Sequence, residues 1–146
     1  MKTKKLSSLL FCLFIFVSYN AFSNHIEVTN VSLTGKDISG TPHFIMVNFD
    51  MSWENSWRTS SAPNNWDAAW VFVKYRVKVA SGGDGEWHHA SLNNTSIAPS
   101  NSTIDIGLLT PGAAFDATTN PGLGAFIYRS ANGNGPNSFA DVQLRW

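Results

Sequence analysis

Apolar and polar residues alternate along much of the chain, which is the pattern of β-strands rather than helices. The clearest example runs from Ala69 to Val79, where every second residue is Ala, Val or Tyr. The residues between them begin with Trp70 and Phe72 and then become cationic. Because neighbouring residues of a strand point to opposite faces of a sheet, this segment is predicted to be a strand with one continuously apolar face.

Other segments show the same two-residue alternation. Residues 42–54 place apolar side chains at every second position, opposite Asn, Asp and Ser. Weaker strands are predicted at 26–33, 86–92, 103–109, 124–129 and 139–146. In the first of these, the apolar phase slips by one residue near Thr29 and Asn30, which indicates a bulge or a change of sheet.

The connections between these strands complete the prediction of the fold. Glycine-rich segments at 81–85 and 132–137 are typical of hairpins, and the longer segments 55–67 and 93–102 are predicted loops, where binding sites often lie. Seven or eight strands without a convincing helix predict an all-β fold. The expected architecture is an antiparallel two-sheet β-sandwich with an immunoglobulin- or fibronectin III-like layout, and a closed barrel is the alternative.

The first 23 residues are predicted to be a signal peptide, followed by one domain at 24–146. Three lysines open the chain, an uncharged apolar run follows at 9–17, and small residues flank position 22 as a cleavage site requires. The apolar run is too short to span a bilayer. We therefore expect an exported protein, periplasmic, cell-surface or extracellular, with no membrane span after cleavage.

Composition narrows the chemistry of residues 24–146. Residues 1–23 hold three of the ten basic residues, none of the ten acidic ones and the single Cys, so the remainder carries a net charge near −3. This charge argues against a nucleic-acid partner bound through bulk positive charge. Without Cys, the domain has no disulfide, thiol nucleophile or thiolate metal site, and we expect neither a metal nor a cofactor.

Four tryptophans fall between positions 53 and 70. Trp53 and Trp70 continue strand patterns and are predicted to lie in the core. The favoured interpretation is that these indoles hold together a domain without disulfides. The alternative is a ligand platform that stacks on a sugar, with these candidate binding residues: Trp57, Arg58, Asn64 and Trp66.

Charged and ionisable residues suggest no reaction centre. A cationic row on one strand face (Lys74, Arg76 and Lys78) is expected to be solvated or paired with Asp50 or Asp141, and an anion-binding stripe is the alternative. His88 and His89 are adjacent, so they should point to opposite faces and not share a metal. No spacing singles out a pair among the carboxylates, so a hydrolase with a carboxylate pair is the least favoured hypothesis and no catalytic residue is assigned.

A family resemblance rests on five blocks of sequence. They are residues 53–58 (WENSWR), 62–76 (APNNWDAAWVFVKYR), 87–90 (WHHA), 124–129 (GAFIYR) and 142–146 (VQLRW). Together they resemble the N-terminal region of exported Bacteroidetes proteins that continue into a domain of the formylglycine-generating, sulfatase-modifying enzyme type. In that family the enzyme-like domain lies downstream of this region, so the resemblance carries no catalytic residue onto this chain.

The expected function follows from these observations. The chain is expected to be a non-catalytic accessory or interaction module of an exported bacterial protein, either truncated before a formylglycine-generating-type domain or a stand-alone relative. Its expected partner is that downstream domain or a glycan. A carbohydrate-binding module that uses the loop tryptophans is the main alternative.

Overall fold

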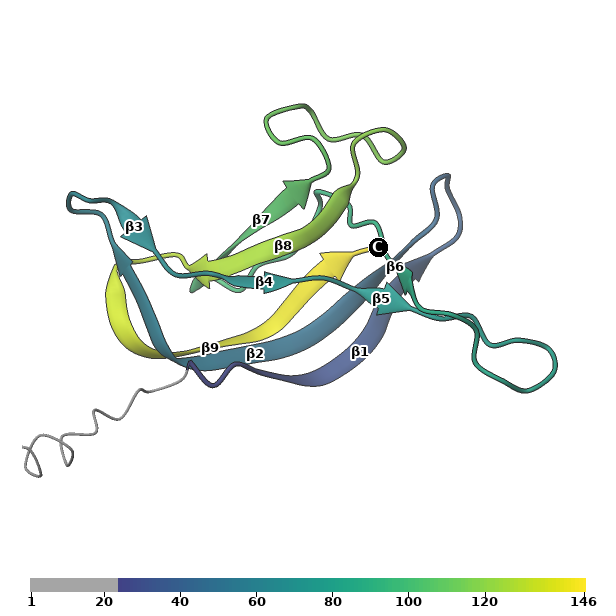
Figure 1. Cartoon of the computed structure of the whole chain (residues 1–146), viewed down its shortest axis with the longest axis horizontal. Coiled ribbons are helices and arrows are strands. Elements are labelled where there is room, and N and C mark those ends of the chain that lie inside the picture. The colour runs from purple at the N-terminus through teal and green to yellow at the C-terminus, as the bar shows by residue number, and fades with distance from the viewer. Residues whose placement is uncertain (1–23) are drawn as a thin grey trace, which may run out of the picture.

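Strands make up all the regular structure in residues 24–146, which are the residues described by the computed structural model (Figure 1). The predicted signal peptide lies outside the described residues. The strands are β1 (Glu27–Asp37), β2 (Phe44–Thr59), β3 (Asn65–Trp66), β4 (Ala69–Val71), β5 (Lys74–Tyr75), β6 (His88–His89), β7 (Ser102–Leu108), β8 (Gly122–Arg129) and β9 (Gly133–Arg145). No helix occurs between residues 24 and 146, so the all-β prediction is confirmed.

The largest sheet is built around β2. β1 pairs antiparallel with the first part of β2, β3 pairs with its last two residues, and β9 pairs with it over most of its length. Figure 1 shows β1, β2 and β9 side by side as one curved layer. The predicted phase slip in β1 is confirmed, because the β1–β2 register shifts between Thr29 and Ser32, where Asn30 has a φ of 52°.

Two smaller antiparallel sheets face this layer. One has the order β4-β8-β7, and the other consists of β5 and β6. An isolated bridge between Leu92 and Gly122 links the segment after β6 to β8. None of these sheets closes on itself, so the closed-barrel alternative is not what forms.

Side chains from both layers meet in one hydrophobic core. The largest sheet contributes mainly the odd-numbered face of β2 and the buried residues of β9. The β4-β8-β7 sheet contributes Ala69, Ala125 and Ile127. Trp53 is 2% exposed and packs edge-to-face on Phe139, with ring centroids 5.3 Å apart. Burial of one such large apolar side chain contributes roughly 1.5–3 kcal/mol, so this shared core is what joins the layers.

The segment 55–67 is not the long loop that its polar residues indicated. β2 continues through Ser56 and Trp57 to Thr59, and β3 pairs back onto it. The register between β2 and β9 shifts between Trp53 and Ser56. This irregularity moves the buried face from odd to even positions, so Ser56 is fully buried and the simple alternation ends.

The glycine-rich segment 132–137 does not form a hairpin between β8 and β9. β9 begins at Gly133 and pairs with the end of β2, whereas β8 belongs to the other layer. Residues 130–132 therefore carry the chain from one layer to the other. Gly135 has a φ of +92°, a conformation that glycine adopts at no steric cost in this part of β9.

The strand predicted at 69–79 is interrupted, and Trp70 is not in the core. β4 and β5 are separate strands, and Val77 and Val79 beyond them are exposed. Trp70 is 43% exposed, and its ring packs on Phe126 across the outer face of the sheet, with centroids 4.6 Å apart. Trp70 follows the even face of its strand, which points away from the core.

Candidate functional site

The structure brings Arg58 and Trp66 together. Arg58 of β2 is the cross-strand partner of Trp66 of β3, and its guanidinium carbon lies 5.0 Å from the centre of the Trp66 ring. The same carbon lies 5.3 Å from the centre of the Tyr128 ring, and Tyr128 stacks on Trp66 at 5.4 Å. These three side chains contact one another through cation–π and stacking interactions.

The other two predicted binding residues lie apart from this stack. Trp57 directly precedes Arg58 in a regular part of β2, so its side chain points to the opposite face of the sheet, where it is 40% exposed. Asn64 is exposed immediately before β3. The four residues therefore do not form a single platform, and ligand binding by any of them stays a prediction.

Asp67 anchors this end of β2, a role that the sequence did not indicate. Its carboxylate accepts hydrogen bonds from the Trp53 indole Nε1 at 2.8 Å, the Trp57 backbone N at 2.9 Å and the Ser56 hydroxyl at 3.3 Å. Arg129 donates to the same Ser56 hydroxyl at 2.8 Å. Asp67 is thus a structural hub that fixes the end of β2 after the shift in register.

Tyr128 is the member of this stack whose pKa is shifted. Its hydroxyl donates a hydrogen bond to the Asp105 carboxylate. Burial, and then this hydrogen bond, raise the pKa of Tyr128 above its usual value near 10. Tyr128 is therefore a neutral donor at physiological pH.

The cationic row finds its partner within its own hairpin. Arg76 and Lys78 both pair with Asp84, which lies in the glycine-rich turn, rather than with Asp50 or Asp141. The predicted partners were therefore wrong, whereas the solvated alternative holds for Lys78, whose side chain is 89% exposed. Lys74 differs from the other two: within residues 24–146 it makes no ion pair, and its amine lies 5.7 Å from the centre of the Phe72 ring.

The adjacent histidines diverge as expected. His88 packs on Tyr75 and His89 on Phe72, which lie on opposite faces of the strand. Among residues 24–146, no three His, Cys, Asp or Glu side chains come together as a metal site would require. The described part of the chain also contains no helix long and apolar enough to cross a membrane.

Three carboxylates accept hydrogen bonds that lower their pKa values. Those from Ser39 lower the pKa of Asp37, those from the Asn30 side chain and the Asp141 backbone lower the pKa of Asp50, and those from Thr119 and Thr118 lower the pKa of Asp116. Each of these groups is therefore firmly ionised at neutral pH. Their hydrogen bonds bind turns and neighbouring strands together.

An apolar groove of about 340 Å³ lies between β1 and the β4–β5 segment. Its floor comes from Val47 and Phe49 of β2, and its rim includes Lys74. The remaining walls are mostly aliphatic and aromatic: Val28, Val31, Leu33, Val71, Phe72, Val73, Tyr75 and Trp146. Its volume falls within the usual range for ligand sites.

The groove exists because the smaller layer is too narrow to cover β1. Among residues 24–146, β1 pairs only with β2 and forms one edge of the largest sheet, and β4 forms one edge of the sheet that packs over the largest sheet (Figure 1). After the bulge, Val31 and Leu33 keep the apolar face toward the groove, yet they are 64% and 61% exposed. This strand face has core-like side chains, and no strand formed by residues 24–146 covers it.

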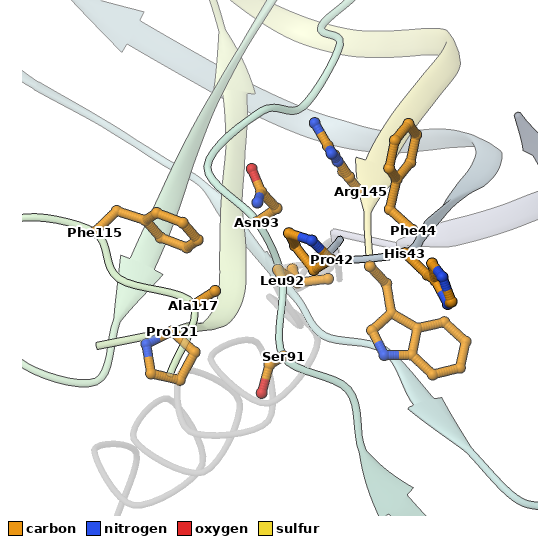
Figure 2. Close-up of a pocket in the computed structure, with 11 residues that line it drawn as sticks. Pro42, His43, Phe44, Ser91, Leu92, Asn93, Phe115, Ala117, Pro121 and Arg145 are labelled. Atoms are coloured by element: carbon orange, nitrogen blue, oxygen red, sulfur yellow. The ribbon is translucent and has the colours of Figure 1, made fainter. Parts of the chain in front are cut away.

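A second hollow lies at the end of the two layers (Figure 2). It measures about 90 Å³ and is lined in part by Phe44, Leu92, Phe115 and Arg145. Figure 2 shows the Arg145 side chain beside Phe44, and its guanidinium carbon lies 3.7 Å from the centre of that ring. This hollow is too small for most organic ligands, whereas the apolar groove reaches the usual size of a ligand site.

Comparisons with family models, with curated proteins and with solved structures find no match to the chain.

Proposed function

We propose that this chain is a non-catalytic interaction module of an exported protein, and that it binds a polypeptide partner in the groove between β1 and the β4–β5 segment. One observation carries the proposal. The groove combines exposed apolar side chains with sheet edges that have no further neighbour in the described chain. Such edges are ready templates for another chain, and soluble proteins normally cover or charge them.

The exposed surface is large enough to matter energetically. Val28, Val31 and Leu33 are each about half to two-thirds exposed. At roughly 1.5–3 kcal/mol for each fully buried side chain, covering these three would contribute about 3–5 kcal/mol before the cost of association. A partner that also occupied the floor of the groove would gain more.

The finer features of the proposal have separate support. A β-sandwich with an immunoglobulin- or fibronectin III-like layout is supported by two antiparallel layers that share one core. Export is supported by the pattern of residues 1–23. A position ahead of a formylglycine-generating-type domain is supported by the sequence resemblance alone, and that domain would then be one candidate partner.

A peptide-display selection against the full chain tests the function. We expect peptides to be enriched whose binding is lost in Leu33→Glu but kept in Ile38→Glu. Both residues are exposed to a similar extent, but only Leu33 lines the groove, so the pair separates a groove effect from added charge. Failure to enrich any peptide, or equal binding to both variants, would refute the proposal.

A glycan site at Trp57 is the second candidate. The exposed indole on the outer face of β2 could stack on the apolar side of a sugar ring. Binding on a glycan array should then be lost in Trp57→Ala and kept in Trp87→Ala, which removes another exposed indole from a different part of the chain. Glycan binding that both variants retain would exclude Trp57 as its site.

A further inference from the structure

The uncovered face of β1 has the width of one missing strand. β4 and β5 pack over β2, because Val71, Val73, Val47 and Phe49 line the same groove. No residue between 24 and 146 occupies the neighbouring strand position of that layer, which would lie over β1. One extended segment placed beside β4–β5 would therefore lie directly over the apolar face of β1, at the usual spacing of neighbouring strands.

The backbone beside this position is oriented to receive a strand. The Val73 carbonyl accepts a hydrogen bond from the Ala90 N–H, so Val73 directs its backbone toward the β6 segment. Backbone groups alternate in direction along a strand, so those of Phe72 and Lys74 point to the other edge. That edge borders the groove, and a bound segment could pair with it.

Charge specifies one position of the bound segment. Arg76 and Lys78 share the carboxylate of Asp84, whereas Lys74 has no carboxylate partner among residues 24–146. Lys74 lies at the rim of the groove and on the outer face of its strand. A cross-strand neighbour on that face would be best matched by Asp or Glu.

We infer that the groove binds an extended polypeptide strand that adds to the β4–β5 edge, with apolar residues at alternate positions toward β1 and an acidic residue opposite Lys74. This inference rests on the proposed function and names the partner's chemistry. Backbone pairing supplies affinity in this mode of recognition, and alternate side chains supply specificity. An acyl chain would fill the same apolar volume but could not satisfy the backbone of Phe72 and Lys74.

The test uses two synthetic peptides of nine residues in which Val alternates with Thr. The central Thr is replaced by Glu in one peptide and by Lys in the other. The full chain should bind the Glu peptide about three- to tenfold more tightly, since one exposed charge contact is attractive in one case and repulsive in the other. In Lys74→Glu the preference should reverse, whereas Lys78→Glu, whose native partner is Asp84, should leave it unchanged.

Amide hydrogen exchange by NMR provides the second measurement. The Glu peptide should slow exchange at Phe72 and Lys74, and a peptide with N-methyl groups on the paired side should lose binding. Peptide binding without this protection, or without a charge preference, would overturn the strand model while leaving the proposed function intact. If dodecanoate displaced the peptide and the amides of Phe72 and Lys74 were not protected from exchange, the groove would be an amphiphile site. If the protein self-associated and thereby blocked peptide binding, the occupant would be a second copy of the chain. Either result would overturn the inference, and no binding of any peptide would remove the function as well.

Discussion

Removal of the Asp67 carboxylate should destabilise the domain more than removal of any exposed acid. Asp67→Ala leaves the indole N–H of Trp53 without its acceptor, in a side chain that is only 2% exposed. A buried donor without a partner costs about 1–3 kcal/mol, and hydrogen bonds to a charged group contribute about 1.5–3 kcal/mol. The Trp57 backbone N–H is close to solvent, so water replaces part of its bond. We therefore expect a loss of about 2–4 kcal/mol in the free energy of unfolding.

Urea denaturation followed by far-UV circular dichroism measures this loss without relying on tryptophan fluorescence, which the substitution itself would alter. Glu54→Ala is the matched control, since it removes an exposed acid from the same region and should change stability by no more than about 0.5 kcal/mol. Asp67→Asn keeps one acceptor oxygen and should fall between the two.

A double-mutant cycle identifies the bond responsible. Trp53→Phe keeps an aromatic ring but removes the donor, so its effect should not add to that of Asp67→Ala. The coupling should be about 1–2 kcal/mol. If Asp67→Ala cost no more than Glu54→Ala, or if the two changes at the hub were additive, the assignment of Asp67 as an anchor would be wrong.

Three further predictions concern stability. Gly124→Ala should strongly destabilise the domain, because its new Cβ would lie 2.7 Å from the Val71 carbonyl oxygen; Gly40→Ala, with nothing within 4 Å, should be tolerated, and thermal unfolding would compare the two. Because Asn30 and a backbone N–H lower the pKa of Asp50, its contribution is present above about pH 4 and is lost as the pH falls through the lowered value. Urea titrations should therefore show a smaller acid-induced loss in Asp50→Asn. The raised pKa of Tyr128 acts in the opposite direction, so stability should fall as the pH rises above about 10, and Tyr128→Phe should remove that dependence.

The two-residue alternation of apolar and polar residues predicted where strands occur, because a strand buried on one face has apolar side chains at every second position. It located β2, β7 and β8, and it placed Trp53 in the core. It failed where the backbone breaks its own alternation. After the register shift near Ser56 the simple alternation ends, so the polar residues in the last third of β2 were predicted to be a loop.

The period could not tell which strands become neighbours. Nothing in the pattern of β9 indicates that it pairs with β2 rather than with β8, because pairing depends on the path of the whole chain. The groove could not be predicted either, because it also depends on how the strands are arranged in the folded chain. The apolar positions of β1 were visible in the sequence, but that the opposite layer stops short of them is a property of the assembled fold.

The partnership of β2 and β9 has a consequence for how the chain reaches its folded state. Asp50 and Asp141, which join these two strands, are 91 residues apart in sequence. Contacts between such distant segments require a large loop to close first, and domains dominated by them fold in milliseconds to seconds rather than microseconds. Until β9 has been synthesised and pairs with β2, the apolar face and one edge of β2 are exposed and can associate with other chains. Shielding β2 during synthesis should therefore reduce the fraction of the chain that aggregates.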